Sequence, residues 1–216
     1  MKPEELKASL GALGITGLAL DIDETLSHTS KIWIADMHKS FGSREGLTAE
    51  EMVQKYRYPN DVPYWLEQEH LDWMNRTMGS DEINESLPII ENAHSVVQRI
   101  NTIVPIVAYI TARPESVRES TKRWLTKHNF PEAPVILRPP EFHIRDANKW
   151  KAGVLHYLYP QVQGIIDDNQ KLERDMTPDY KGTIYLYNLN SCNRTDINVV
   201  CCPTWEDAYE SIKKSR

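Results

Sequence analysis

The segment Gly17-Leu18-Ala19-Leu20-Asp21-Ile22-Asp23-Glu24-Thr25-Leu26 leads from apolar residues directly into two carboxylates with one residue between them. Residues 18–20 predict a short strand that is buried on both faces, which is typical of a parallel sheet. An ionised carboxylate at the end of such a strand is too costly to bury without a partner. Asp21 is therefore expected at the rim of the sheet, where open α/β sheets bind their ligands.

Asp21 and Asp23 are expected to face the same point, because residues two apart in an extended segment share one side. Two carboxylates that converge repel each other, and each raises the pKa of the other unless a cation or a shared proton relieves them. A divalent metal ion is the simplest cation for this position. The alternative for an isolated Asp-x-Asp pattern is a turn with two solvated acids. Other motifs in the chain are needed to choose between a metal site and a turn.

A second apolar run, residues 103–110, predicts a strand that stops at the hydroxyl of Thr111. A helix is expected over about residues 115–128, and Pro114 suits its first position. Free backbone N–H groups and the positive end of the helix dipole favour an anion beside Thr111. A plain helix-capping threonine is the alternative.

A third apolar run, residues 162–166, ends at Asp167 and Asp168. Adjacent side chains of an extended strand diverge. One of these two carboxylates can therefore point to a metal near Asp21, while the other stands farther out.

Two candidate lysines lie on a helix predicted just before this third run. Helical spacing places Lys151 in line with Leu155 and Leu158, near the buried side, whereas Lys149 is more exposed. A solvated position on the helix surface is the alternative for either lysine. We expect Lys151, rather than Lys149, to reach the acids.

The chain order is carboxylate pair, threonine, lysine, carboxylate pair, and this order resembles the haloacid dehalogenase superfamily over nearly the whole chain. The resemblance implies an α/β fold: a Rossmann-like three-layer sandwich with a central parallel sheet, plus a small, mainly helical cap. It also implies further strands at residues 183–187 and 199–202. The motifs that carry it are Asp21 to Leu26, Thr111, Lys151, and the pair Asp167 and Asp168.

The resemblance implies a magnesium-dependent phosphatase that hydrolyses a small phosphate monoester. Asp21 would attack the phosphoryl group and form an aspartyl-phosphate. Asp23 would protonate the leaving alcohol and then activate the water that releases phosphate. In this superfamily an aspartate at the second position accompanies phosphatases and phosphomutases, whereas dehalogenases and ion-pumping ATPases lack it. No Gly-x-x-x-x-Gly-Lys-Ser/Thr loop occurs, which disfavours a kinase.

The resemblance also implies which residues bind the phosphate and the metal. The phosphate would be held by Thr111, Ala112, Arg113 and Lys151. Magnesium prefers a few oxygen ligands together with several waters. Its ligands would be Asp21, the backbone carbonyl of Asp23, and Asp167, with Asp168 behind them. Arg113 can fork onto a phosphate or a cap carboxylate, and an ordinary surface salt bridge is its simpler alternative.

Residues 27–87 are predicted to be a helical cap inserted into a core made of residues 1–26 and 88–216. An insertion of this length is too long for an ordinary loop. Thr48 opens a capping box whose helix runs towards Tyr56, and residues 63–78 predict a second helical stretch. The aromatic residues of the insertion form either its own core or a shelf on which a nucleobase stacks. They are Trp33, Phe41, Tyr58, Trp65 and Trp73.

Three other functions remain open. A weaker resemblance to the cytosolic 5'(3')-deoxyribonucleotidases implies a 5'-nucleotidase-type enzyme, and residues 111–118 also resemble the phosphatase half of polynucleotide end-healing enzymes. A non-catalytic phosphate-binding protein would keep the fold without turnover. A signalling receiver combines the same residue types with magnesium, but its lysine comes last in the chain, whereas the lysine here precedes the final acid pair.

The composition limits the partners of the chain. Its 216 residues carry a formal net charge of −6, which disfavours a nucleic-acid polymer and leaves a small anionic phosphate ester as the expected partner. The oligomeric state does not follow from the sequence. The expected location is cytoplasmic, because Cys192, Cys201 and Cys202 predict no disulfide, the amino terminus lacks a basic leader and no segment is long enough to span a membrane.

Overall fold

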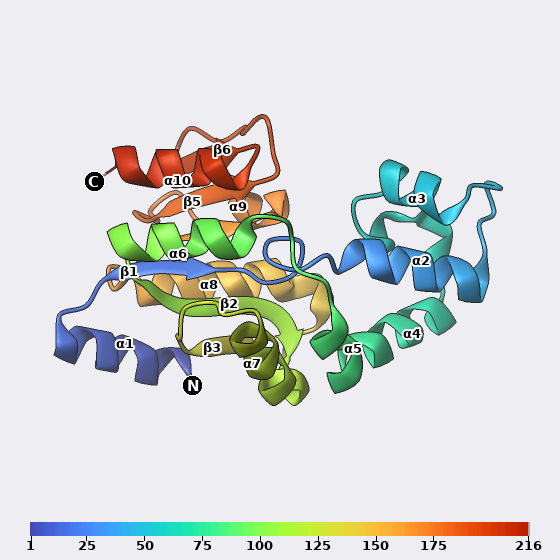
Figure 1. The fold of residues 1–216 in the computed structure, drawn as a ribbon, viewed down its shortest axis with the longest axis horizontal. Coiled ribbons are helices and arrows are strands. Elements are labelled where there is room, and N and C mark those ends of the chain that lie inside the picture. The colour runs from blue at the N-terminus through green and yellow to red at the C-terminus, as the bar shows by residue number, and fades with distance from the viewer. Residues whose placement is uncertain (216) are drawn as a thin grey trace.

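One sheet of six parallel strands forms the centre of residues 1–215, the part of the chain that the computed structural model describes. The strands are β1 (Gly17–Leu20), β2 (Ile106–Pro114), β3 (Val135–Arg138), β4 (Val162–Asp167), β5 (Thr183–Tyr187) and β6 (Asn198–Cys202). Their order is β3-β2-β1-β4-β5-β6 (Figure 1). The order of strand addition reverses between β1 and β4, and in such sheets the ligand site lies outside the carboxyl ends at this reversal.

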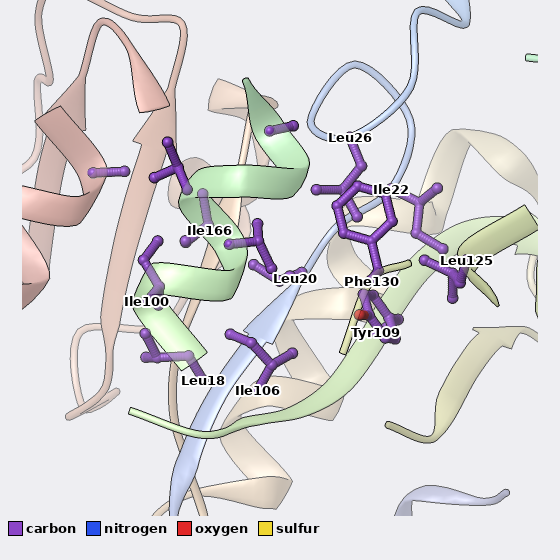
Figure 2. Close-up of a cluster of buried hydrophobic side chains, with 14 of the residues drawn as sticks. Leu18, Leu20, Ile22, Leu26, Ile100, Ile106, Tyr109, Leu125, Phe130 and Ile166 are labelled. Atoms are coloured by element: carbon purple, nitrogen blue, oxygen red, sulfur yellow. The ribbon is translucent and has the colours of Figure 1, made fainter. Parts of the chain in front are cut away.

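Helices cover both faces of the sheet. One face packs against α6 (Ala93–Ile103), α7 (Arg118–Lys127) and α10 (Trp205–Lys214), and the other against α1 (Pro3–Leu13), α8 (Ala147–Leu158) and α9 (Gln170–Asp175). Side chains of β1 alternate between the two cores. Leu18 and Leu20 belong to the first, which Figure 2 shows, and Ala19 belongs to the second. The predicted three-layer α/β sandwich with a central parallel sheet is confirmed.

The chain between β1 and α6 forms helices of its own. They are α2 (Ser30–Phe41), α3 (Ala49–Lys55), α4 (Gln68–Met78) and α5 (Asp81–Ser86), with the short 3₁₀ helices η1 (Pro59–Asp61) and η2 (Pro63–Trp65). In Figure 1, α2, α3 and α4 lie on the side towards which β1 points, whereas α5 packs against α7. Residues of α2, α3, η2 and α4, together with Val62, form a hydrophobic cluster separate from the two cores of the sheet: Ile34, Met37, Met52, Val62, Trp65 and Met74. The helical cap is present, and its extent as a domain of residues 27–87 stays a prediction.

The helix boundaries in this cap follow the sequence in one case and depart from it in another. The capping box at Thr48 is confirmed, because its hydroxyl accepts a hydrogen bond from the Glu51 N–H and the Glu51 carboxylate accepts one from the Thr48 N–H. The prediction of a single helical stretch over residues 63–78 is wrong, because Glu67 has an extended backbone (φ −71°, ψ 157°) that separates η2 from α4. Across residues 1–215, no helix combines the length and the apolar character needed to cross a bilayer.

The cysteines differ from the sequence-based expectation. Cys192, in the loop before β6, is bonded to Cys201 of β6, with 5.8 Å between their Cα atoms. The prediction of no disulfide is therefore wrong. It considered the adjacent pair, whose side chains do diverge, whereas the bridge joins residues nine positions apart that the β5–β6 connection brings together. The cysteines no longer support a reducing compartment, and the cytoplasmic location stays a prediction.

Candidate functional site

The candidate site lies where β1 and β4 end side by side. Leu20 is aligned with Ile166, and the N–H of Asp21 donates to the carbonyl of Ile166 at 2.9 Å. Asp21, the residue after β1, therefore lies beside Asp167, the last residue of β4. A cavity of about 550 Å³ opens at this point, between the sheet and the cap.

Three carboxylates meet at the end of the two strands. Asp21, Asp167 and Asp168 each place one carboxylate oxygen within 4.8 Å of the others, and all three side chains are buried. The Asp23 side chain is not a member of this group, although it lines the same cavity as Asp21. Asp21 and Asp23 thus share the cavity but have different partners.

Lys151 of α8 neutralises part of this charge. Its Nζ donates to Asp21 Oδ1 at 2.8 Å and to Asp167 Oδ2 at 2.7 Å, and its side chain is 3% exposed. Lys149 is exposed and lines a different cavity. The structure therefore brings Lys151, and not Lys149, to the acids.

The charges of the group are not balanced by Lys151 alone. Burial raises the pKa of Asp21 well above its ordinary value, and the charges of Asp167 and Asp168 add to the rise against the opposing effect of Lys151. Burial and the charge of Asp167 raise the pKa of Asp168 to about 7. Burial alone would lower the pKa of Lys151, but the two acids beside it outweigh this and raise it. Such a group of buried oxygen ligands fits a hard divalent cation.

Asp168 is held by residues from both the core and the cap. Thr25 Oγ1 lies 3.4 Å from Asp168 Oδ1 and accepts from the Asp168 N–H at 3.1 Å. From the cap, Tyr58 Oη donates to Asp168 Oδ2 at 2.7 Å, and Arg57 donates to the Asp168 backbone carbonyl at 2.8 Å. The sequence interpretation gave no role to Arg57 and counted Tyr58 only among the aromatic residues of the cap. No local pattern marks them, since the contact joins residues 110 positions apart.

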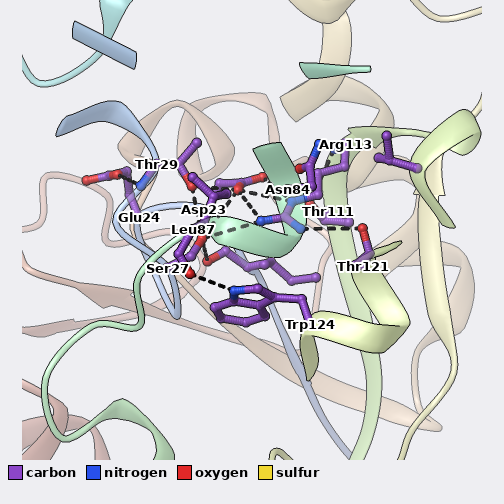
Figure 3. Close-up of polar contacts among 12 residues, drawn as sticks. Asp23, Glu24, Ser27, Thr29, Asn84, Leu87, Thr111, Arg113, Thr121 and Trp124 are labelled. Carbon is purple, nitrogen blue, oxygen red and sulfur yellow. Dashed lines mark hydrogen bonds and ion pairs between the residues drawn. The ribbon is translucent and has the colours of Figure 1, made fainter. Parts of the chain in front are cut away.

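Asp23 is paired with Arg113 (Figure 3), and both residues line the cavity. The Arg113 guanidinium donates to both Asp23 carboxylate oxygens at distances of 2.8–3.1 Å. Burial works against ionisation of Asp23, but the charge and hydrogen bonds of Arg113 outweigh it, so the pKa of Asp23 is lowered. The prediction that Arg113 forms a surface salt bridge is wrong, because its side chain is 1% exposed and packs over the Trp124 ring.

A short loop ties Asp23 to the start of the cap. Thr29 Oγ1 donates to Asp23 Oδ1 at 2.7 Å. Glu24, which has a positive φ of 60°, accepts from the N–H groups of Thr29 and Ser30 at 2.7 and 2.6 Å. The Glu24 carboxylate thereby satisfies two free donors at the amino terminus of α2. Glu24 lies within the first motif, but its capping role could not be read from the motif alone.

Thr111 differs from its predicted position at a strand end. β2 continues to Pro114, so Thr111 lies inside the strand, where it is fully buried and its hydroxyl accepts from the Arg113 N–H at 3.3 Å. The extension exists because Thr111 pairs with Leu137 of β3 and, after a register shift, Pro114 pairs with Arg138. Ala112 and Arg113 line the cavity, whereas Thr111 is not among the described residues that line it. A contact between Thr111 and phosphate stays a prediction.

The cap supplies an apolar wall to the cavity. Trp33 and Tyr58 line it, whereas Trp65 is buried in the cap cluster with Phe41 and Trp73 packed against that cluster. The aromatic residues of the cap thus divide between its core and the cavity. The further apolar residues that the cap places at the cavity are Pro59, Leu66, Leu71, Met74 and Met78. The basic residues Arg145 and Lys171 line it in addition to Arg113 and Lys151.

Known proteins resemble this chain in part of its sequence and in its fold. The family model described as PITM 1-3, LNS2 domain matches residues 77–169, which include Lys151, Asp167 and Asp168. No curated protein matches the sequence.

Two solved structures are similar to nearly the whole chain. A HAD-superfamily hydrolase from Ehrlichia chaffeensis is 13% identical over 93% of this chain and 97% of its own, with a TM-score of 0.52. A candidate beta-phosphoglucomutase from Thermotoga maritima is also 13% identical, over 94% of this chain and all of its own (100%), with a TM-score of 0.50. Such low identity establishes architecture and not activity. On this likeness and the strand order, the chain has the fold of the haloacid dehalogenase superfamily, as the motifs predict.

Proposed function

We propose that the chain is a magnesium-dependent phosphatase that hydrolyses a small phosphate monoester through an aspartyl-phosphate on Asp21. The observation that carries this proposal is the position of Asp21, a buried carboxylate that lines a cavity, accepts a hydrogen bond from Lys151 and stands beside two further acids. A nucleophile with a neighbouring cation and an open approach is what displacement at phosphorus requires.

Asp21 would form the new bond to phosphorus while the bond from phosphorus to the leaving oxygen breaks. Lys151 holds Oδ1 of Asp21 at 2.8 Å, whereas the hydrogen bond at Oδ2 is a long one, 3.5 Å from Thr25 Oγ1. Oδ2 is therefore the less engaged oxygen and the better placed to attack. The Lys151 ammonium would also offset negative charge on the equatorial phosphate oxygens, and Ala112 and Arg113 lie at the same cavity to bind them.

Asp23 would serve first as acid and then as base. Its lowered pKa and its pairing with Arg113 suit the second role directly, because an ionised carboxylate can take a proton from the water that hydrolyses the aspartyl-phosphate. The first role needs a proton on Asp23. A phosphate dianion bound beside it would favour that proton by like-charge repulsion.

Asp21 and Asp167 would bind the magnesium ion directly, with Asp168 of the same group behind them, and the backbone carbonyl of Asp23 is a further expected ligand. When bound, magnesium would supply positive charge that offsets the repulsion between the acids and an anionic phosphate ester. The sequence-based choice of Asp167 over Asp168 as the inner ligand stays part of this proposal.

The proposal is tested by phosphate release from a panel of monoesters that includes sugar phosphates, small phospho-acids and nucleoside monophosphates. Magnesium-dependent release from any of them supports a phosphatase. Absence of release from all of them, in a protein that still binds phosphate, would favour the non-catalytic phosphate-binding protein.

A nucleotide is the second candidate substrate. The observation in its favour is that Trp33 and Tyr58 both line the cavity, so that an aromatic leaving group would meet aromatic side chains. A kcat/KM for nucleoside monophosphates well above that for sugar phosphates would support the 5'-nucleotidase-type enzyme. The net charge of −6 continues to disfavour a nucleic-acid end as substrate.

Asp23→Asn is expected to lower turnover by roughly 10²–10⁴-fold, the usual contribution of a proton-transfer group. The loss should be larger for an alkyl phosphate than for 4-nitrophenyl phosphate, because a good leaving group needs less protonation. Steady-state rates on the two esters measure the difference. Because the change also leaves Arg113 without its carboxylate, thermal unfolding must show that the variant is folded at the assay temperature. An equal loss on both esters would indicate a role at the metal site instead.

Asp167→Ala is expected to raise the magnesium concentration needed for half-maximal activity by more than about 100-fold, beyond the 10–100-fold typical of residues that act behind the ligands. Asp168→Ala is expected to raise it less. Magnesium titrations of both variants, measured with one substrate, decide between the two acids. A larger effect of Asp168→Ala would exchange their roles.

A further inference from the structure

The cap reaches the acidic group through one short segment, residues 57–61. Arg57 and Tyr58 of this segment each donate a hydrogen bond to Asp168. Arg57 also donates to the Asn188 carbonyl at 3.3 Å, and Asp61 lies 3.9 Å from Lys171 Nζ. This segment therefore docks on residues that follow β4, including Lys171 of α9, and on the loop that follows β5. Its contacts end on a carboxylate of the candidate metal site.

The Asp168 carboxylate is held from two sides. Thr25, from the loop after β1, lies at Oδ1, and Tyr58, from the cap, donates to Oδ2. The hydrogen bond from Tyr58 is the shorter of the two, at 2.7 Å against 3.4 Å. The orientation of this 2% exposed side chain thus depends on a residue of the cap.

We propose that Tyr58 is a positioning residue for the cation site, through which docking of the cap and binding of the cation reinforce each other. The inference rests on the proposed metal site. A carboxylate that is already oriented loses less freedom when it takes up an ion, so affinity rises. By linkage, an ion that binds more tightly when the cap is docked must stabilise the docked cap to the same degree.

Tyr58 offers a cleaner test than its neighbour. Arg57 brings a positive charge close to Asp168, with 3.4 Å between Nη2 and Oδ2, so its removal would alter both charge and geometry. Tyr58 is neutral, and Tyr58→Phe removes one hydroxyl while keeping the ring that faces the cavity. A change in cation affinity can then be attributed to the lost hydrogen bond.

The experiment is calorimetric titration of Mg²⁺ into the full chain without substrate. Tyr58→Phe is expected to bind Mg²⁺ about tenfold more weakly than the unaltered chain, the lower end of the effect of residues that orient metal ligands. The magnesium-induced rise in the unfolding midpoint should shrink in the same variant. Tyr64→Phe is the matched control, because it removes a cap hydroxyl that is bonded within the cap to Ser43 at 3.0 Å, and it should leave the affinity unchanged.

Each other outcome counts against the proposal. Unchanged Mg²⁺ affinity in Tyr58→Phe would show that the hydroxyl is merely structural, and tighter binding would show that it competes with the cation. Either result, in a chain whose turnover still needs magnesium, would overturn this inference and leave the proposed function standing. If the unaltered chain binds no Mg²⁺, the metal part of the proposed function fails together with this inference.

Discussion

Asp21→Asn is expected to lower the turnover of every phosphate ester tested by more than about 10⁴-fold, beyond what loss of a proton-transfer group causes. The amide has nearly the shape of the carboxylate, but it cannot act as the attacking anion. It also removes one negative charge from a group in which the pKa of Asp21 is already raised, so the folded state should not suffer. Single-turnover and steady-state rates, together with the thermal unfolding midpoint, measure the two effects.

The control for Asp21→Asn is Asp36→Asn, an equivalent change at an exposed aspartate on α2. It should leave both turnover and the unfolding midpoint unchanged. Activity close to that of the unaltered chain in a folded Asp21→Asn protein would overturn the covalent mechanism.

Removal of divalent cations is expected to abolish activity completely. Asp21, Asp167 and Asp168 converge where an anionic substrate must also bind, and Lys151 supplies one positive charge against three negative ones. A chelator should therefore stop turnover, and added magnesium should restore it. Calcium should inhibit, because its larger and more flexible coordination shell lets Asp21 bind in a bidentate manner and lose the lone pair needed for attack.

The rate is measured after treatment with chelator and dialysis, and then across a titration with each ion. Magnesium titrated in the presence of a fixed calcium concentration shows whether the two ions compete for one site. Full activity after exhaustive chelation would rule out the proposed metal dependence, whatever the fate of the other predictions.

Three strands of the sheet could be predicted from local patterns, namely the apolar runs that lead to Asp21, Thr111 and Asp167. β5 and β6 are expected from the resemblance, whereas β3 is not predicted. The apolar run before Asp21 needs both faces buried, and the structure gives Leu18, Ala19 and Leu20 at most 2% exposure. β5 has the bounds that the sequence predicts. The end of β2 could not be predicted, since it depends on pairing with β3 after a register shift and not on the residues around Thr111.

The candidate site could be predicted where its residues terminate strands, as Asp21 and Asp167 do. The choice of Lys151 over Lys149 also follows from local spacing, because the two lysines lie on different sides of one helix. The partners of these residues could not be predicted. The residues next to Arg113 in the sequence predict a surface position, whereas in the structure its guanidinium is buried in a pair with Asp23, 90 positions away. Tyr58 reads as an aromatic residue of the cap core, and its contact with Asp168 depends on how the cap docks.

The central position of β1 has a consequence for how the chain reaches its native state. β1 is made early in synthesis, yet Leu18 pairs with Ile106 and Leu20 with Ile166, so both of its edges wait for segments that are made much later. Pairings of this long range close slowly, because a large loop must be ordered before contacts form. Until β4 emerges from the ribosome, the backbone on one side of Asp21 has no strand beside it. The reactive carboxylate is therefore completed late, after most of the chain has been made.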